Sequence, residues 1–377
     1  MKILIAPDSF KESLSSIAAA QAIEKGWRQV FPDAECVKLP VADGGEGTVD
    51  ALVFATQGHC FDAEVHDPLG QRITARYGTD ATGRVAFIEM AAASGLMLVP
   101  PDKRNPLVTS SYGTGELIRA ALDRGFADIL IGIGGSATND GGAGMLQALG
   151  IRLLDRDGRD LPPGGAALSQ LARIDMSGQH PRLADCRVQI ACDVNNPLTG
   201  LQGASAVFGP QKGATPEMVR QLDAALARFA TILQRDTGKE VANLPGAGAA
   251  GGMGAALLAC CRAKLRPGID IVLETIAMEQ HLRDATLVIT GEGRIDAQTV
   301  HGKTPVGIAR LAQKHGVPVI AIAGGIGAGA EAVFAHGITA LHAIVPAPCT
   351  LREALDHAAA NIERTVRNIA ATFAIGR

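Results

Sequence analysis

The chain begins with Lys2-Ile3-Leu4-Ile5-Ala6-Pro7-Asp8, and its architecture can be worked out from this stretch onward. The apolar run predicts a buried strand, and we expect an amphipathic helix over 14–31 and a second strand over 36–41 to follow it. A helix over 47–56 comes next. The last third of the chain repeats this pattern, with strands at 286–290, 318–323 and 341–345 and helices at 305–315, 330–336 and 351–373. Short apolar runs that alternate with helices are typical of a doubly wound parallel sheet.

The middle of the chain has a different pattern. Three alternating segments at 61–66, 72–77 and 84–89 are separated by turns, which predicts a meander of strands rather than strand–helix units. Thr215 followed by Pro216 predicts the capped start of a long helix that runs to about 237. The other elements expected here are helices at 114–124 and 142–149, a strand at 129–133, and a strand pair formed by 151–155 and 187–193.

These patterns together predict an α/β protein with two α/β domains. The first is a flavodoxin-like doubly wound parallel sheet built from both chain ends, residues 1–64 and 281–377. The second is a mixed α+β domain, residues 65–280, inserted into the first. We expect the functional site in the cleft between them, because small-molecule sites are common at domain interfaces.

Composition limits the class of function. A net charge of −3 and an aromatic content of 3% give no attraction to nucleic acid and no platform for base stacking. The 377 residues contain no apolar stretch of the length that a membrane span needs, and the first apolar run is too short for a signal peptide. Seven cysteines without C-x-x-C spacing, including the vicinal Cys260 and Cys261, predict reduced thiols in the cytoplasm.

Two glycine loops that carry acids give the strongest functional signal. One is Ala42-Asp43-Gly44-Gly45-Glu46-Gly47-Thr48, and the other is Gly134-Gly135-Ser136-Ala137-Thr138-Asn139-Asp140-Gly141-Gly142. Each follows a predicted strand and precedes a helix, so its backbone N–H groups can face an anion. Carboxylates beside a phosphate site usually require a divalent cation between the two charges. We therefore predict phosphoryl transfer, although favourable acids at a helix start would also explain part of the first loop.

Further candidates lie at the ends of other predicted strands. Asp8, Ser9 and Lys11 follow the first strand, although Ser9 could simply cap the next helix. Asp193 ends the 187–193 strand, where it could act as a base, bind magnesium or only form a turn before Pro197. The remaining candidates are Glu292 and Arg294 after the 286–290 strand, and Lys303 at the start of a helix. The stretch 246–251 matches G-x-G-x-x-G, but no strand precedes it, so it predicts either an anion site or close helix packing.

These segments, in this order, resemble the type I glycerate kinase family of bacteria along nearly the whole chain. The matching segments include 6–13, 41–48, 88–91, 113–115, 134–144, 191–197, 208–213, 245–254 and 289–296. The resemblance implies a two-domain α/β fold and phosphorylation of D-glycerate with ATP and Mg²⁺. It also implies a place in glycerate, glyoxylate or sugar-acid catabolism.

Within that reading, we expect the 134–142 loop to hold phosphate oxygens through Gly134, Gly135, Ser136, Thr138, Asn139 and Asp140, with Asp8 and Ser9 also binding. Asp193 or Asp43 is the expected general base. Glu46 or Glu292 would reach magnesium through water, and Lys11, Arg294 or Lys303 would hold the glycerate carboxylate or the transferring phosphoryl group. Bacterial relatives favour 2-phosphoglycerate as the product over 3-phosphoglycerate. The rival is a non-catalytic sensor of a phosphorylated metabolite, which would need the glycine loops but not the acids.

Overall fold

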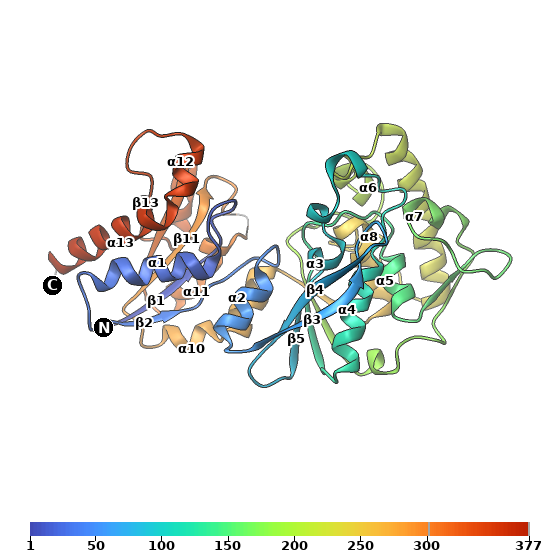
Figure 1. Ribbon diagram of the computed structural model, residues 1–377, viewed down its shortest axis with the longest axis horizontal. Helices are drawn as coiled ribbons and strands as arrows, with labels where there is room; N and C mark the ends of the chain where they lie inside the picture. The colour runs from blue at the N-terminus through green and yellow to red at the C-terminus, as the bar shows by residue number, and fades with distance from the viewer. Residues whose placement is uncertain (301, 376–377) are drawn as a thin grey trace. The chain divides into compact units, whose positions relative to one another are not determined.

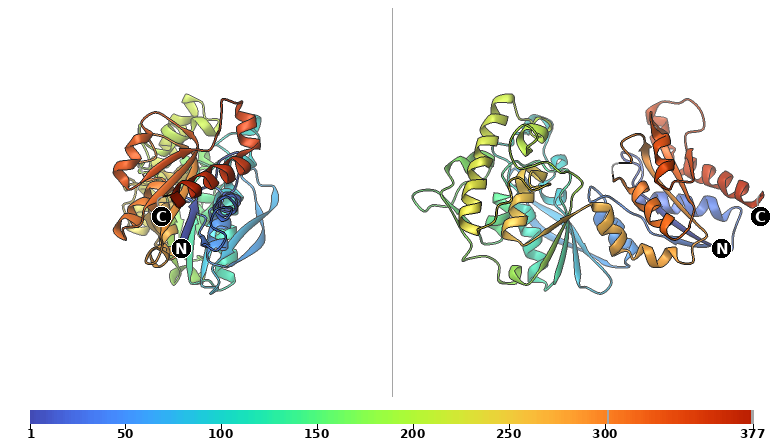
Figure 2. Two further views of the ribbon diagram at one scale, coloured as in Figure 1. Left: turned by 90° about the vertical axis from the view of Figure 1, so that its left-hand side faces the viewer. Right: turned by 180° about the vertical axis from the view of Figure 1, so that it is seen from behind.

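The computed structural model describes residues 1–300 and 302–375. The chain forms two compact units (Figure 1). The first unit comprises residues 1–43, 50–57 and 269 to the C-terminus, and the second comprises 44–49 and 58–268. The strand that begins the chain and the helix that ends it both belong to the first unit (Figure 2). Among the helices of the described residues, none is long and apolar enough to cross a bilayer.

The first unit is built on a five-stranded sheet in which every neighbouring pair is parallel. The spatial order is β13-β12-β11-β1-β2. Counted in chain order within the unit, this is the order 2-1-3-4-5 of flavodoxin-like sheets, which confirms the predicted fold class. The strands are β1 (Lys2–Pro7), β2 (Glu35–Lys38), β11 (Leu287–Ile295), β12 (Val319–Ile326) and β13 (Ala340–Ala343).

Helices cover both faces of this sheet. Helix α1 (Ser16–Arg28) packs against α13 (Ala358–Ile375), and the ring of Trp27 stacks on Phe31 between them. Ile3 and Ile5 face this cluster, so the residues alternating with them face α11 (Thr304–Lys314) on the other side. The other helices that lie wholly or mostly in this unit are α2 (Thr48–Ala55), α9 (Gly268–Thr275), α10 (Met278–Leu282), α12 (Leu351–Asp356) and the 3₁₀ helix η6 (Ala330–His336).

Two predicted helices of this unit differ from the structure. The 330–336 segment is a 3₁₀ helix, flanked by Gly329 and Gly337, both with positive φ. The predicted helix 351–373 is two helices, α12 and α13. A capping box between Thr350 and Glu353 begins α12, and His357 leaves the helical conformation at φ −104° and ψ 10°. Continuous apolar periodicity does not report such a one-residue break.

The second unit contains a six-stranded mixed sheet with the order β10-β9-β6-β5-β4-β3. Its members are β3 (His59–His66), β4 (Arg72–Thr79), β5 (Val85–Glu89), β6 (Asp128–Gly132), β9 (Arg187–Ala191) and β10 (Lys264–Arg266). The first three strands form the predicted antiparallel meander. From β5 to β10 the neighbours are parallel. This unit therefore also has a row of parallel strand ends at one edge.

The predicted pairing of 151–155 with 187–193 is wrong. Strand β7 (Arg152–Leu154) pairs with β8 (Arg173–Asp175), a strand that apolar patterning did not indicate, and β9 lies between β6 and β10. Helix α7 (Pro216–Thr237) begins as predicted, because the Thr215 hydroxyl accepts a hydrogen bond from the Met218 N–H at 3.2 Å.

The other helices of the second unit are α3 (Ala91–Ser94), α4 (Tyr112–Asp123), α5 (Ala143–Ala148), α6 (Ala204–Phe208) and α8 (Ala249–Cys260), with 3₁₀ helices η1 (Leu96–Leu98), η2 (Pro101–Lys103), η3 (Gly165–Gln170), η4 (Pro181–Ala184) and η5 (Pro210–Lys212).

Candidate functional site

A pocket of about 450 Å³ lies in the first unit, at the carboxyl ends of its strands. It adjoins the boundary between β1 and β11, where the strand order reverses, and such switch points are the usual ligand sites of open α/β sheets. Seven side chains predicted from the sequence line it: Asp8, Ser9, Lys11, Asp43, Glu292, Arg294 and Lys303. The structure thus brings together residues that lie nearly 300 positions apart in the chain.

The acids of this pocket influence one another. Burial, followed by repulsion from Asp43, raises the pKa of Asp8 to about 6, although hydrogen bonds offset part of this change. The Thr304 hydroxyl donates to Asp8 Oδ2 at 2.7 Å, and the Ser9 N–H donates to Oδ1 at 2.6 Å. Burial is also the main cause that raises the pKa of Glu292 to about 7, and the charges of Asp8 and Asp43 add to it. Burial thus raises the pKa of both Asp8 and Glu292, and repulsion between neighbouring carboxylates adds to this effect.

Basic side chains line the same pocket. Lys303 is the residue before α11, and its Nζ lies 3.8 Å from Glu292 Oε2, which lowers the pKa of Glu292 against the effect of burial. The Arg294 guanidinium is exposed and donates to Asp296 Oδ2 at 3.0 Å. Lys11 is exposed on the pocket rim. The pocket thus offers cations for a small anion next to carboxylates that can accept a proton or bind a cation.

Carboxylate oxygens are the ligands that Mg²⁺ prefers, and this donor set fits a cation in chemical type. Among the described residues, no three His, Cys, Asp or Glu side chains are gathered closely enough to hold a metal directly. Mg²⁺ commonly keeps several waters and uses only one or two carboxylates, so the arrangement fits an ion bound through water and substrate oxygens. Of the two predicted metal ligands, Glu292 lies in this pocket, and Glu46 is an exposed residue of the second unit.

The raised pKa of Glu292 predicts that a neutral side chain at this position would stabilise the protein. The pKa of Glu292 is about 7 in the folded protein, against an ordinary value of 4.5. Between pH 4.5 and pH 7, the folded state therefore keeps a proton on this carboxyl group that the unfolded chain has already released. The free energy of unfolding therefore falls as pH rises through this window, and the penalty is fully present above pH 7. Glu292→Gln removes it and should raise the free energy of unfolding by roughly 1–3 kcal/mol near pH 8.

The measurement is chemical unfolding of wild type and Glu292→Gln near pH 8 and near pH 4, with a chelator present. Near pH 4 the carboxyl is protonated in both states, so the two proteins should differ little there. An equal gain at both pH values would contradict the assigned cause, because it would point to packing rather than to charge.

The other predicted residues lie in the second unit. Gly134 and Gly135 are exposed at the end of β6, and the 44–49 segment packs beside them. A Cβ atom on Gly132 would lie 2.2 Å from the Gly44 carbonyl oxygen, so the two backbones touch. The Val49 N–H donates to Glu89 Oε1, at the end of β5, at 2.7 Å. The two glycine loops therefore meet at the strand ends of this unit.

The buried half of the 134–142 loop is fixed by hydrogen bonds to neighbouring parts of the protein. Asp140 Oδ2 accepts from the Ser111 N–H and hydroxyl at 2.9 and 2.8 Å and from the Gly144 N–H, and its Oδ1 accepts from Gly142 N–H. The Asp140 carboxylate thus anchors the loop, and a ligand contact by it stays a prediction. The Asn139 amide donates to the Ser205 hydroxyl at 2.9 Å. The G-x-G-x-x-G stretch packs on this loop, since the Gly141 N–H donates to the Gly251 carbonyl oxygen at 2.9 Å.

Asp193 is an exposed residue after β9. Its Oδ1 accepts a hydrogen bond from the Gly268 N–H at 2.9 Å, at the start of α9. Capping of a helix start is a sufficient structural reason for an aspartate at this position. Its predicted role as a base stays a prediction.

Sequence reasoning missed three polar residues that the structure places at these sites. Thr304 bonds Asp8, and the Thr299 hydroxyl donates to Glu292 Oε1 at 3.1 Å. Lys212 is buried beneath the 134–142 loop. The only sequence signal for Lys212 was its place in the 208–213 segment that resembles the glycerate kinases, and single threonines give no signal of their own.

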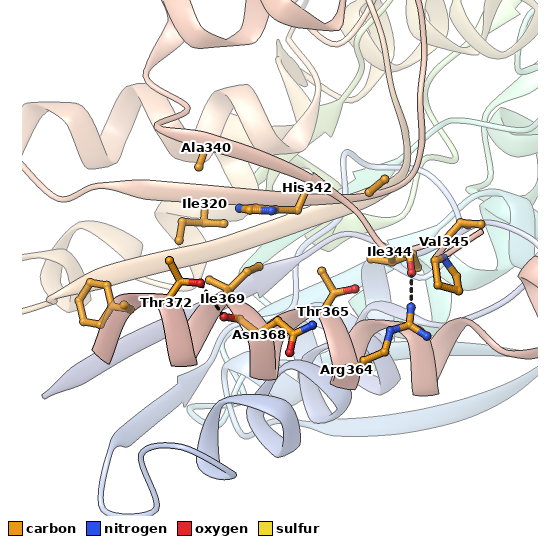
Figure 3. A pocket seen from close by; sticks show the side chains of 13 residues that line it. Ile320, Ala340, His342, Ile344, Val345, Arg364, Thr365, Asn368, Ile369 and Thr372 are labelled. Atoms are coloured by element: carbon orange, nitrogen blue, oxygen red, sulfur yellow. Dashed lines mark hydrogen bonds between the residues drawn. The ribbon is translucent and has the colours of Figure 1, made fainter. Parts of the chain in front are cut away.

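A larger pocket of the first unit, about 670 Å³, lies between β13 and α13 (Figure 3). The Arg364 guanidinium donates to the Ile344 carbonyl oxygen at 2.9 Å at one end of it, and His342 and Ile320 lie along its strand side. None of the residues predicted from the sequence lines this pocket. Its size alone does not make it the functional site.

Comparison with known proteins gives concordant matches. A model of the "Glycerate kinase family" matches residues 3–374. A glycerate kinase of Bacillus subtilis (strain 168) is 58% identical over 377 residues, which is 100% of this chain and 99% of that protein. A glycerate 2-kinase of Escherichia coli (strain K12) is 56% identical over 376 residues, with shares of 100% and 99%. A crystal structure of a provisionally named glycerate kinase 2 from Salmonella typhimurium LT2 has a TM-score of 0.92 and 58% identity, covering 100% of this chain and 99% of its own.

Proposed function

Since the chain belongs to the glycerate kinase family, we propose that it transfers a phosphoryl group from ATP to D-glycerate with the help of Mg²⁺. As a member of this family it is an enzyme, a kinase. The observation that carries the proposal is the 450 Å³ pocket at the strand switch point, where four acids and three basic side chains line a space suited to a small anion.

Glycerate has one carboxylate and two hydroxyl groups. The pocket has basic side chains that could bind the carboxylate and acids that could accept a hydroxyl proton. Lys11, Arg294 and Lys303 would hold the glycerate carboxylate or compensate the charge of the transferring phosphoryl group. Asp43 would accept the proton of the attacking hydroxyl. We favour it over Asp193 because Asp43 is one of the residues that line the pocket and Asp193 is not.

Glu292 would hold Mg²⁺ through water, with Asp8 beside it and with Glu46 as the other acid predicted for this role. When bound, the ion would neutralise phosphate charge and help orient the phosphate oxygens. The protein's own part is to place the acids and to position the reactants, which is the larger share of catalysis in phosphoryl transfer. Thr304 and Thr299 fix the orientation of Asp8 and Glu292 by hydrogen bonds.

The ATP phosphates would bind on the 134–142 loop, where Gly134 and Gly135 are exposed and Ser136 follows them as a buried residue. Thr138 and Asn139 stand directly behind them, in the buried part of the loop. The glycines there allow backbone N–H groups to approach an anion.

An assay of ADP formation tests the activity. With ATP and Mg²⁺ present, we expect ADP to appear only when D-glycerate is added. ATP consumption that does not depend on D-glycerate, or the absence of turnover, would contradict the proposal.

The product should be 2-phosphoglycerate. The relative from Escherichia coli, 56% identical, is named a glycerate 2-kinase, which supports transfer to the 2-hydroxyl. Phosphorus NMR of the reaction mixture separates the two possible esters, and a 3-phosphoglycerate signal would overturn this assignment while leaving the kinase activity intact.

We further propose that the protein acts in the cytoplasm on small molecules alone. Cys260 and Cys261 are buried free thiols, and burial raises the pKa of Cys260 to about 12. Unreactive reduced thiols of this kind are usual in a reducing compartment.

A further inference from the structure

Lys212 is a lysine enclosed almost completely by protein. Only 2% of the residue is exposed, at the end of η5 beneath the 134–142 loop. Its Nζ donates hydrogen bonds to the Ser136 hydroxyl at 2.7 Å and to the Thr138 carbonyl oxygen at 2.6 Å. Lysine is almost never fully buried unless its charge is paired, so this position calls for a reason.

The surrounding protein does not balance this charge with a direct ion pair. Within the part of the chain that the structure describes, no carboxylate lies within ion-pairing distance of Lys212 Nζ. Asp140 acts on it through its charge, but the Asp140 oxygens are already engaged by Ser111, Gly142 and Gly144. Burial consequently lowers the pKa of Lys212 to about 7. A buried cation without a counter-ion is costly, and an anion bound nearby would remove that cost.

Two more polar atoms on the same loop lack partners. Thr138 Oγ1 and Asn139 Oδ1 are buried, and neither has a hydrogen-bond partner among the described residues. Buried polar atoms are nearly always hydrogen-bonded, so such exceptions indicate a ligand or ordered water. The outer side of the turn, at Gly134 and Gly135, is exposed. An unpaired cation, two unpartnered polar atoms and an open turn therefore occur on one loop.

We propose that Lys212 is a positioning residue for a phosphate group bound on the turn of Gly134, Gly135 and Ser136. The Ser136 oxygen accepts a hydrogen bond from the Lys212 ammonium, which leaves the hydroxyl hydrogen to donate to a phosphate oxygen. Lys212 supplies the compensating charge from behind the loop and does not itself touch the phosphate. This inference rests on the proposed function, because the phosphate would be that of ATP.

Lys212→Met tests the inference. Methionine is unbranched, fills irregular apolar space and removes the buried charge, so the variant should unfold at the same temperature as wild type or higher. Its dissociation constant for ATP, measured by titration calorimetry, should rise roughly 10- to 100-fold, because the Ser136 hydroxyl that would bind the phosphate loses the charge-assisted hydrogen bond from Lys212. Its affinity for D-glycerate should not change. A folded Lys212→Met protein that binds ATP as wild type does would overturn the inference.

Two further variants make the result decisive. Lys239→Met removes one exposed lysine of the same unit and should leave ATP affinity unchanged, which controls for net charge. Ser136→Ala removes the hydroxyl that transmits the effect and should weaken ATP binding in the same direction. If Lys212→Met does not fold, undiminished ATP affinity in Ser136→Ala overturns the inference. If wild type neither binds ATP nor phosphorylates D-glycerate, the proposed function itself has failed, and that failure is visible before any variant is made.

Discussion

Asp43→Asn should lower kcat for D-glycerate phosphorylation by roughly 10²- to 10⁴-fold, with little change in KM for D-glycerate. Asparagine has the same shape as aspartate but cannot accept the hydroxyl proton. The substrate would still be held by the basic side chains of the pocket, so binding should survive. Steady-state kinetics with varied D-glycerate at saturating ATP, together with a thermal unfolding midpoint, measure both effects.

Asp193→Asn is the matched comparison for this substitution. The amide oxygen of asparagine can still accept the hydrogen bond from the Gly268 N–H, so Asp193→Asn should change stability little and leave kcat near the wild-type value. The opposite pattern, with turnover lost in Asp193→Asn and kept in Asp43→Asn, would reassign the base to Asp193. Near-full turnover in both variants would show that neither carboxylate is the base.

Gly251→Ala should destabilise the second unit by about 3 kcal/mol or more. Gly251 has φ +68°, a conformation that L-residues rarely adopt, and a Cβ atom there would lie 2.0 Å from the Thr138 carbonyl oxygen. The same oxygen accepts the hydrogen bond from Lys212. The substitution must therefore displace the 134–142 loop, and we expect ATP binding to weaken along with stability. Chemical unfolding and ATP titration measure the two losses.

Gly83→Ala separates the two causes of this destabilisation. Gly83 has nearly the same backbone conformation, φ +67°, but a Cβ atom there would meet nothing within 4 Å. Gly83→Ala should therefore lower the free energy of unfolding only by the conformational penalty of about 1–2 kcal/mol. Equal losses of stability in the two variants would mean that the close approach to Thr138 is not what requires glycine at position 251.

Much of the fold was predictable because apolar runs report burial directly. The residues 2–6 and 286–290 were both expected as strands of one parallel sheet, and Ile3 lies in register with Leu287. The family expected from the motifs is confirmed by the full-length matches. The pairing of β7 with β8 was not predictable, because the sequence pattern of such short strands does not indicate which strand each of them pairs with. The break at His357 likewise depends on one backbone conformation rather than on residue type.

The candidate site was predictable in part. Residues at strand ends could be expected to gather at one edge, and Asp8, Asp43 and Glu292 do line one pocket. Sequence could not distinguish an acid that faces a pocket from one whose oxygens are all engaged inside the protein, as those of Asp140 are. Nor could it identify Lys212, because its significance lies in burial without a counter-ion, which only the folded structure defines.

The division of the chain between the two units has a consequence for its synthesis. The second unit is almost continuous, from 58 to 268, whereas the first needs β1 to pair with β11, nearly 300 residues later. Because chains are made from the N-terminus at roughly 5–20 residues per second, β1 and α1 must wait tens of seconds or less for their partners while the second unit can already fold. During that interval β1 can pair with β2 but lacks its other neighbour, β11. The pocket lined by Asp8 and Glu292 can therefore be completed only after the whole second unit has been synthesised.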